Sequence, residues 1–255
     1  MSLVSDRVAR KVALISGAAR GMGASHALVL AEHGAKVVIG DLLDEEGRAL
    51  AAKINADVGH DVALFVHLDV TDFESWQRAV SAAVDRFGQL DVLVNNAGIF
   101  TRGSVEEADV DEWRRTVDID LTGNFLGMKA AVPVMKGGGG SIINISSIAG
   151  LVGFKNRAAY AAAKWGVQGL TKTSALDLGP YGIRVNSVHP GSVTTPMTAG
   201  LKRGLGQIPL GRAAEVQEIS DLILFLASDE SRFMTGANLA IDGGETAGNN
   251  LREDA

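Results

Sequence analysis

Short apolar runs rich in β-branched residues alternate along the chain with longer stretches of helical periodicity. The runs predict seven strands, at residues 11–16, 35–41, 62–70, 90–95, 141–146, 183–190 and 237–242. Helices are predicted between them, at residues 22–33, 44–56, 72–87, 111–135, 160–178 and 215–228. Most of the strands are continuously apolar, which is typical of a sheet that is covered by helices on both faces.

Repeated strand–helix–strand units predict an α/β fold with a doubly wound, seven-stranded parallel sheet, because parallel neighbours need right-handed crossovers. No linker, repeat or low-complexity segment divides the sequence, and the glycine run at 137–140 is interpreted as a loop between a helix and a strand. A length of 255 residues suits one large α/β domain. We therefore expect a single domain over residues 1–255.

The composition narrows the class of protein. Hydrophobic residues make up 46% of the chain and charged residues 21%, as in soluble globular proteins. The net charge of −6 and the lack of a basic block give no support for a nucleic-acid partner. The absence of cysteine excludes disulfides and thiol chemistry. The first ten residues lack the apolar core of a signal peptide, and no apolar run approaches the ~20 residues that span a bilayer. We expect a soluble, cytoplasmic protein without a membrane partner.

The stretch "SGAARGMG" at 16–23 follows the first predicted strand and opens the first predicted helix. Gly17, Gly21 and Gly23 permit a tight turn that lets the backbone approach a pyrophosphate. The helix N-terminus then offers free N–H groups and a partial positive charge to the phosphates. The turn therefore predicts a dinucleotide site.

Asp41 ends the second predicted strand, 20 residues after Gly21. A carboxylate there can accept hydrogen bonds from the adenosine ribose and would repel a 2′-phosphate. Leu42 and Leu43 follow it, and neither side chain could pair with that phosphate. Arg20 is the contrary residue, since a basic group in this turn can serve NADP. We weigh the fixed carboxylate above the flexible guanidinium and expect NAD.

The stretch "YAAAK" places Tyr160 and Lys164 four residues apart on one face of a predicted helix. A phenol titrates near ~10 in water, and a nearby cation favours the phenolate. Taken alone, the pair is more often an ordinary feature of a helix surface. Its meaning depends on the rest of the chain.

The rest of the chain resembles the short-chain dehydrogenase/reductase family over essentially its whole length. The motifs that carry the resemblance are "SGAARGMG", "LDV" at 68–70, "NNAG" at 95–98, Ser147, "YAAAK", "PGSVTTPM" at 190–197 and the closing "TGANLAIDGG". Within the family the chain is most similar to bacterial NAD-dependent 3α(or 20β)-hydroxysteroid dehydrogenases. The resemblance implies a Rossmann fold with a cofactor half at about 1–140, a catalytic and substrate half at about 141–255, and a homotetramer.

The resemblance also implies roles for individual residues. Tyr160 matches the general acid/base, Lys164 its cationic neighbour, and Ser147 the hydroxyl that holds the substrate oxygen. Asp69 matches the residue that binds the adenine amino group, and Val193 and Thr195 match those that hold the nicotinamide carboxamide. The expected NAD-binding residues are Gly17, Arg20, Gly21, Met22, Gly23, Asp41, Leu42, Asp69, Val70, Asn96, Ala97, Gly98, Tyr160, Lys164, Pro190, Gly191, Val193 and Thr195.

One position departs from the family pattern. The stretch "DLTGNF" has Asp120 where an asparagine is usual, and that asparagine holds a water linking the lysine to solvent. An aspartate can accept a hydrogen bond from that water but cannot donate one. Its charge would stabilise the ammonium of Lys164. We therefore expect a proton relay in altered form, and Asn124, one turn further along, does not substitute for the missing amide.

Residues 197–210 follow the nicotinamide segment and are interpreted as a lid over the substrate. An apolar pocket is expected from Phe100, Ala149, Phe154, Met197, Leu201 and Leu205. The five histidines are scattered without metal-ligand spacing, so no metal site is expected.

The sequence thus predicts an oxidoreductase that transfers a hydride between NAD(H) and a secondary alcohol or ketone, with a hydroxysteroid or another bulky apolar alcohol as substrate. Two alternatives stay open. Reduction of a 3-oxoacyl thioester would call for NADPH and a basic surface, and Asp41 and the acidic balance disfavour it. A non-catalytic nucleotide-binding protein of the same fold is disfavoured by the intact Ser147, Tyr160 and Lys164.

Overall fold

A computed structural model describes residues 6–198 and 205–248. All seven predicted strands are present and form one parallel sheet in the order β3-β2-β1-β4-β5-β6-β7. The strands are β1 (Val12–Ser16), β2 (Lys36–Asp41), β3 (Ala63–His67), β4 (Val92–Asn95), β5 (Gly140–Ile145), β6 (Ile183–Pro190) and β7 (Asn238–Ile241). The chain order reverses between β1 and β4, where open α/β sheets bind ligands beyond the carboxyl ends of their strands. The predicted α/β fold is confirmed.

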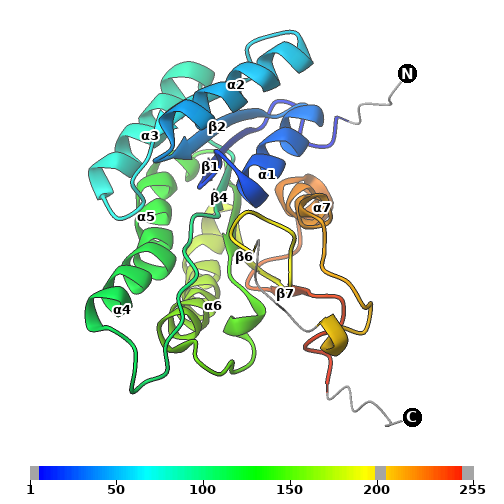
Figure 1. Cartoon of the computed structure of the whole chain (residues 1–255). Helices are drawn as coiled ribbons and strands as arrows, with labels where there is room; N and C mark the ends of the chain where they lie inside the picture. The colour runs from blue at the N-terminus through cyan, green and yellow to red at the C-terminus, as the bar shows by residue number, and fades with distance from the viewer. Residues whose placement is uncertain (1–5, 199–204, 249–255) are drawn as a thin grey trace.

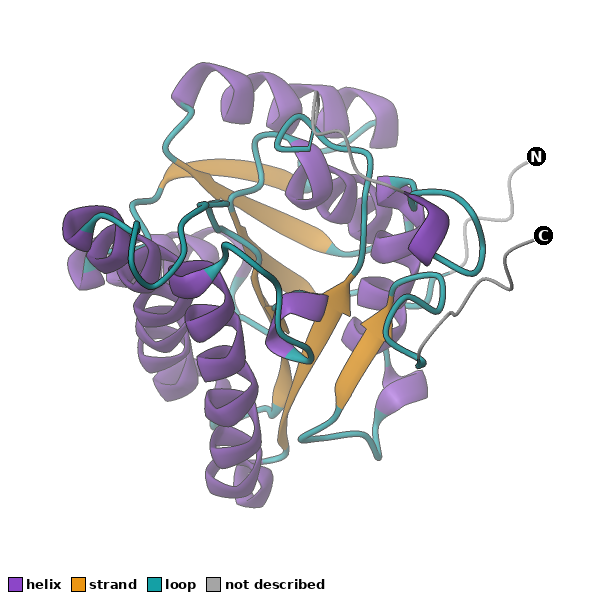
Figure 2. Ribbon diagram, turned by 60° about the horizontal axis from the view of Figure 1, so that its bottom comes forward, coloured by secondary structure: helices purple, strands orange, loops and turns teal. Residues whose placement is uncertain are grey.

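Helices cover both faces of this sheet (Figures 1 and 2). The longer helices are α1 (Gly21–Glu32), α2 (Asp44–Val58), α3 (Phe73–Phe87), α4 (Val110–Val117), α5 (Gly123–Met135), α6 (Ala158–Leu178) and α7 (Val216–Ala227). The buried side chains of α1, α2 and α7 join one apolar core, and those of α3, α5 and α6 join another. Alternate residues of each strand supply the two cores: Ala13 and Ile15 face the first, and Val12 and Leu14 face the second. Both faces are therefore buried, as the continuous apolar runs require.

The helix predicted at 111–135 is present but not uniform. A π-helical turn, η1 (Asp118–Thr122), separates α4 from α5. Residues in such a turn bond to the fifth residue along rather than the fourth, which rotates the following side chains around the axis. Periodicity alone cannot show this change. Within this turn Asp120 is fully buried and Asp118 is exposed.

The strand predicted at 62–70 is shorter than expected and ends at His67. The backbone turns there: the Asp69 carbonyl accepts from Asp72 N at 3.2 Å. Asp72 then caps α3, with its carboxylate accepting from the backbone N–H groups of Glu74 and Ser75. Leu68 N still donates to the Asp41 carbonyl at 2.9 Å, and Leu68, Asp69 and Val70 line a cavity beyond the strand ends. No helix among the described residues is long and apolar enough to cross a membrane.

Candidate active site

The glycine turn after β1 has a geometry that side chains would prevent. Gly17 lies in the left-handed region, with φ of +61°. A Cβ on Gly23 would lie 2.3 Å from the Gly17 carbonyl oxygen and 2.6 Å from Asn96 Nδ2. The first turn of α1 therefore packs directly against the loop, and no side chain caps the N-terminus of this helix. Backbone N–H groups at such a terminus attract phosphate groups.

Ser16 and Asn96 hold this turn in place. Ser16 Oγ accepts from the backbone N–H groups of Asn96, at 3.0 Å, and Ala97, at 3.1 Å. In return Asn96 Nδ2 donates to the carbonyls of Ser16, at 2.9 Å, and Gly17, at 3.0 Å. These bonds join the ends of β1 and β4 at the point where the strand order reverses, so the floor of the cleft is rigid.

Asp41 faces the same turn from the end of β2. Its carboxylate accepts from Ala19 N at 2.9 Å and from Leu43 N at 3.1 Å. It lines a cavity of about 330 Å³ in the described structure. The expected NAD-binding residues that line this cavity are Gly17, Arg20, Gly21, Met22, Asp41, Leu42, Asp69, Val70, Asn96, Ala97, Gly98 and Thr195. The open glycine cradle, the helix N-terminus and the fixed carboxylate together fit a dinucleotide.

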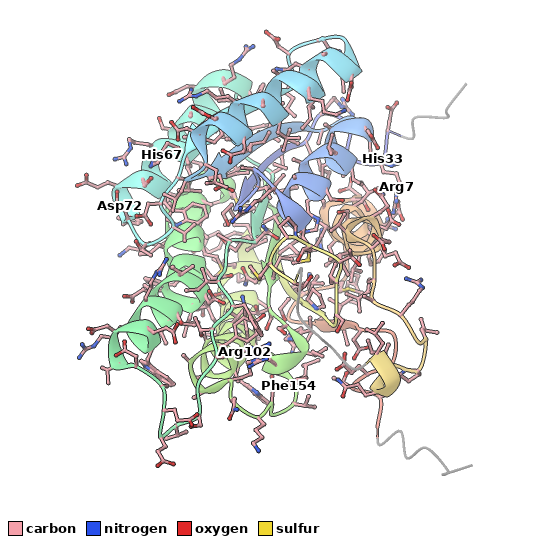
Figure 3. The ribbon with its side chains drawn as sticks, in the orientation of Figure 1. Arg7, His33, His67, Asp72, Arg102 and Phe154 are labelled. Atoms are coloured by element: carbon pink, nitrogen blue, oxygen red, sulfur yellow. The ribbon has the colours of Figure 1, made fainter. Side chains whose placement is uncertain are left out.

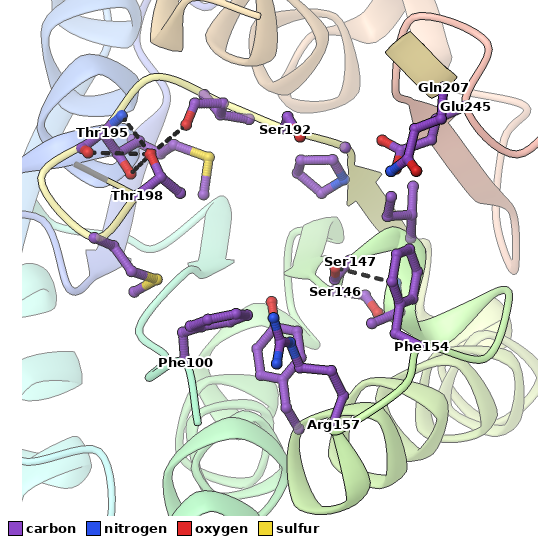
Figure 4. A pocket seen from close by; sticks show the side chains of 18 residues that line it. Phe100, Ser146, Ser147, Phe154, Arg157, Ser192, Thr195, Thr198, Gln207 and Glu245 are labelled. Atoms are coloured by element: carbon purple, nitrogen blue, oxygen red, sulfur yellow. Dashed lines mark hydrogen bonds between the residues drawn. The ribbon is translucent and has the colours of Figure 1, made fainter. Parts of the chain in front are cut away.

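A second cavity, of about 240 Å³, contains Ser147 and Tyr160 (Figure 4). The expected pocket residues Phe100, Ala149, Phe154 and Met197 line it, as do Pro190, Gly191 and Val193 from the segment expected to hold the nicotinamide. Met22, Thr195 and Met197 line both cavities, so the two join into one cleft. The residues of the nucleotide half and of the catalytic half, far apart in the sequence, meet here.

Ser147 is positioned by contacts on both sides of its backbone. It lies two residues beyond the end of β5, and its Oγ accepts from Ala149 N at 3.1 Å. Its carbonyl lies 2.9 Å from His189 Nδ1. Burial lowers the pKa of His189, although the Ser147 carbonyl opposes the shift. The imidazole is therefore neutral, and its Nδ1–H donates to Ser147 because a carbonyl can only accept.

Lys164 and Asp120 form a buried ion pair behind the phenol. Lys164 Nζ lies 3.2 Å from Asp120 Oδ2, with side chains only 4% and 0% exposed. Lys164 Nζ also donates to the Ile145 carbonyl at 3.2 Å and lies 5.6 Å from the centre of the Tyr160 ring. Asp120 Oδ1 accepts from Ile99 N at 2.8 Å. The ammonium thus stands between a carboxylate and the phenol.

The protonation of this pair follows from burial and mutual attraction. Burial disfavours the charge of Lys164, but Asp120 and Tyr160 outweigh it, so the pKa of Lys164 is raised. The pKa of Asp120 is also raised, in this case by burial, and the positive charge of Lys164 limits the rise. Each partner therefore depends on the other to remain charged.

Not every expected residue reaches a cavity. Gly23, Lys164 and Asp120 lie behind the lining of both. The expected pocket residue Leu205 is not among the described residues that line the cavity: it starts a short 3-10 turn and is 37% exposed, and Gln207 from the same turn lines the cavity. Leu201 lies outside the described residues, as do positions 199–204 of the expected lid.

Sequence reasoning missed several lining residues. Arg115 and Ile119, from α4 and the π turn, line the nucleotide cavity. Arg157, Gln207 and Glu245 line the catalytic cavity. Arg157 had a usable signal, since it stands three residues before Tyr160 at the start of the same helix. In the described part of the chain, no three His, Cys, Asp or Glu side chains gather where they could hold a metal ion.

Comparison with known proteins identifies the family. The family model described as "Enoyl-(Acyl carrier protein) reductase" matches residues 17–246, nearly the whole chain. The chain belongs to the short-chain dehydrogenase/reductase family. A crystal structure of a short-chain type dehydrogenase/reductase from Mycobacterium marinum superposes with a TM-score of 0.91 at 35% identity, covering 96% of this chain and 99% of that one. As a short-chain dehydrogenase/reductase, the protein is an oxidoreductase that uses a nicotinamide cofactor.

Two curated relatives refine the resemblance. A trans-4-hydroxycyclohexanecarboxylate dehydrogenase of Sinomonas cyclohexanicum is 86% identical over 259 residues, covering 100% of both chains. A 3-alpha-(or 20-beta)-hydroxysteroid dehydrogenase of Mycobacterium tuberculosis is 54% identical over 246 residues, covering 96% of this chain and 93% of the relative. The predicted likeness to the hydroxysteroid enzymes is confirmed, but the first relative is considerably more similar.

Proposed function

We propose that this short-chain dehydrogenase/reductase is an NAD-dependent dehydrogenase that oxidises a secondary alcohol on a carbocyclic ring, and reduces the ketone in the reverse direction. One observation carries the proposal: Ser147 and Tyr160 line a cavity that opens into the nucleotide cleft. A substrate oxygen held there lies beside a proton carrier and faces the site of the nicotinamide. That arrangement suits an alcohol that loses the proton of its hydroxyl group and a hydride from its carbon.

In the proposed mechanism Tyr160 moves the proton. Val193 and Thr195 would hold a nicotinamide, which would supply the acceptor for the hydride of the alcohol carbon. The phenolate of Tyr160 takes the hydroxyl proton, and in the reverse direction the phenol returns it to the carbonyl oxygen. The Lys164 ammonium favours the phenolate by charge attraction. Ser147 Oγ donates to the substrate oxygen and orients it, and its own position is fixed through Ala149 and His189.

We assign NAD rather than NADP as the cofactor. The Asp41 carboxylate lines the nucleotide cavity and is held by two backbone N–H groups, where it could accept from the hydroxyls of an adenosine ribose. A 2′-phosphate there would meet that negative charge at close range. Arg20 and Arg115 also line the cavity and would favour NADP, but neither removes the fixed carboxylate. We therefore expect kcat/KM to be at least tenfold higher with NAD.

Trans-4-hydroxycyclohexanecarboxylate is the substrate that the 86% identical relative supports. A hydroxysteroid, supported by the 54% identical relative, is the second candidate. The test is to incubate the purified protein with NAD and each alcohol and to follow the absorbance of reduced nicotinamide. Reduction of a 3-oxoacyl thioester should be assayed alongside these alcohols, because it is the alternative enzymatic activity.

The decisive variant is Tyr160→Phe, which removes only the phenolic oxygen. We expect kcat to fall by about 10²–10⁴-fold, the usual contribution of general acid–base catalysis, with binding of NADH retained. Tyr181→Phe is the matched control, since the Tyr181 ring is exposed and lines neither cavity. Full turnover by the Tyr160 variant would refute the mechanism. Absence of turnover by the wild type on every alcohol and ketone would favour the non-catalytic reading. The homotetramer and the cytoplasmic location stay predictions of the sequence.

A further inference from the structure

Three side chains from β6 and β7 lie in line behind the serine of the proposed active site. His189 Nδ1 faces the Ser147 carbonyl at 2.9 Å, and His189 Nε2 lies 2.9 Å from Ser187 Oγ. Ser187 Oγ lies in turn 2.8 Å from Asn238 Oδ1 on β7. We propose that these side chains form one directed hydrogen-bond chain that positions Ser147 for the reaction. The inference rests on the proposed oxidation of an alcohol at Tyr160, and it makes the three side chains positioning residues that do not touch the substrate.

The chain is built into the sheet. Ser187 and His189 are both fully buried on β6. Ser187 stands opposite Asn238 in the parallel register of β6 and β7, so the two side chains lie on the same face of the sheet. Pro190 follows His189 directly and lines the cavity that contains Ser147. The chain therefore runs from the last strand of the sheet to the wall of the catalytic cavity.

The number of hydrogens gives the chain its direction. The Ser147 carbonyl can only accept, so Nδ1 of His189 carries a hydrogen. In a neutral imidazole the other nitrogen, Nε2, then accepts, and it accepts from the Ser187 hydroxyl. Since that hydroxyl has a single hydrogen, it cannot also donate to Asn238. A half-turn of the Asn238 amide exchanges its oxygen and nitrogen, and the neutral imidazole requires the nitrogen to face Ser187 Oγ.

The opposite direction would require a positively charged imidazole. If the hydroxyl donated to the Asn238 oxygen, Nε2 of His189 would have to donate to that hydroxyl while Nδ1 still donated to the carbonyl beyond it. Burial lowers the pKa of His189, and the charges of Lys164 and Lys172 lower it further, against the opposing effect of the carbonyl. Only the direction that starts at the Asn238 amide nitrogen satisfies each of these groups around a neutral ring.

At its far end the chain fixes the peptide group of Ser147. The Ser147 carbonyl accepts from Gly150 N at 2.9 Å as well as from His189, so two donors occupy its two lone pairs. Ser147 Oγ accepts from Ala149 N in the same short turn. A hydroxyl that orients a reacting oxygen must be placed accurately, because a displacement of about 1 Å can cost on the order of 100-fold in rate. We therefore expect the distant members of the chain to affect turnover through the position of Ser147.

Nitrogen-15 NMR of the imidazole rings tests the direction of the chain without any substrate. The signals of His189 are those that disappear in His189→Gln. In the wild type at pH 7 we expect a neutral ring with its hydrogen on Nδ1. Asn238→Asp has nearly the same shape but offers only acceptor oxygens, so the Ser187 hydrogen should turn to the new carboxylate. His189 should then gain a hydrogen on Nε2.

Two other histidines serve as internal references. Figure 3 shows His33 and His67 in the upper part of the molecule and Phe154, which lines the catalytic cavity, in the lower part. The spectra of these two rings should be the same in the wild type and in the variants. A wild-type His189 with its hydrogen on Nε2 alone, or on both nitrogens, would overturn the directed chain. An unchanged His189 ring in Asn238→Asp would overturn it as well.

Turnover of trans-4-hydroxycyclohexanecarboxylate with saturating NAD tests the positioning. Ser187→Ala removes the donor to His189 Nε2. We expect kcat to fall roughly tenfold while the Kd for NADH stays within about twofold, because the serine and not the nucleotide cleft is displaced. Ser141→Ala is the matched control: it removes another buried strand hydroxyl, one that donates to the Leu226 carbonyl at 2.7 Å. The control should change kcat by less than about threefold.

A pair of substitutions at His189 separates positioning from packing. The side-chain N–H of His189→Asn can donate to the Ser147 carbonyl, whereas His189→Leu offers no donor. We expect kcat to fall at least tenfold in His189→Leu and to recover in part in His189→Asn. Wild-type kcat in His189→Leu, or an equal fall in Ser187→Ala and Ser141→Ala, would overturn the positioning role while leaving alcohol oxidation intact. Should the wild type oxidise no alcohol, the proposed function fails by itself, and the NMR spectra decide the chain separately.

Discussion

At the scale of single residues, the buried pair of Asp120 and Lys164 distinguishes this chain from the usual pattern of its family. The carboxylate lies 3.2 Å from the ammonium and also accepts from Ile99 N. A net neutral pair stands behind Tyr160, where an asparagine would leave a net positive charge. The attraction that favours the phenolate is therefore partly cancelled by Asp120.

Replacing Asp120 by asparagine should shift the pH dependence of alcohol oxidation. The pKa of Lys164 is raised by Asp120, so its removal lets the ammonium lose its proton at lower pH. Until that happens the full positive charge acts on the phenol. We expect both limbs of the kcat profile to move to lower pH, by about one unit, the size typical of a nearby charge.

Asp118→Asn is the control for this shift, because Asp118 lies in the same π turn but is exposed. Its pH profile should match that of the wild type. Identical profiles for Asp120→Asn and the wild type would show that Asp120 takes no part in the relay.

At the scale of elements, two local irregularities build the site. The π turn between α4 and α5 contains the buried Asp120, and π turns are frequent at functional positions. The glycine turn lets α1 begin almost in contact with the end of β1. A side chain at Gly23 would not leave room for the first turn of α1 to approach the loop so closely.

A pair of helix glycines tests the close approach of α1. Gly23→Ala adds a methyl group that would meet the Gly17 carbonyl and the Asn96 side chain, so we expect at least a tenfold rise in the Kd for NADH and a lower Tm. Gly169→Ala makes the same chemical change in α6, where a Cβ meets nothing within 4 Å. That control should keep its NADH affinity and gain up to about 1 kcal/mol of stability from helix propensity. NADH titration and thermal unfolding measure both effects, and equal affinities in the two variants would contradict the packing argument.

At the scale of the whole molecule, α1 and α7 pack together on one face of the sheet and enclose a histidine. His26 is fully buried, and its Nδ1 lies 2.8 Å from Ser220 Oγ on α7. Burial lowers the pKa of His26 from 6.5 to about 3. The imidazole is therefore neutral in the folded protein over the whole physiological range.

This burial predicts a loss of stability in acid. Below about pH 6.5 the unfolded chain binds a proton at His26 and the folded protein does not, down to about pH 3. The free energy of unfolding should therefore fall as the pH falls through this window, by up to about 1.4 kcal/mol per pH unit from this residue. Denaturant titrations between pH 7 and pH 4 should show a shallower dependence in His26→Asn. The variant of the exposed His60, His60→Asn, should keep the slope of the wild type, and a wild-type slope in His26→Asn would refute the prediction.

The sequence by itself determined the fold of the protein and the residue types available for its chemistry. Strand and helix periodicities are local, so alternating runs were enough to predict all seven strands. The glycine turn is local too, because it lies within residues 16–23, and so is the Tyr160–Lys164 pair, whose members are four positions apart. The position of Asp41 beside the glycine turn follows from a single βαβ unit. Such features need no knowledge of distant packing.

Only the tertiary structure decided which distant residues meet. The resemblance implied that Asp120 lies near Lys164, but their 3.2 Å contact depends on how the π turn packs against α6, and periodicity does not show a π turn. Arg157 reaches the cavity because its loop pairs with Gly103, far away in the sequence. Gln207 lines the cavity and Leu205 does not, although both belong to one short turn. The orientation of a side chain in a cleft is set by the packing of whole helices and strands against one another. The sequence pattern predicts these elements but does not predict how they pack.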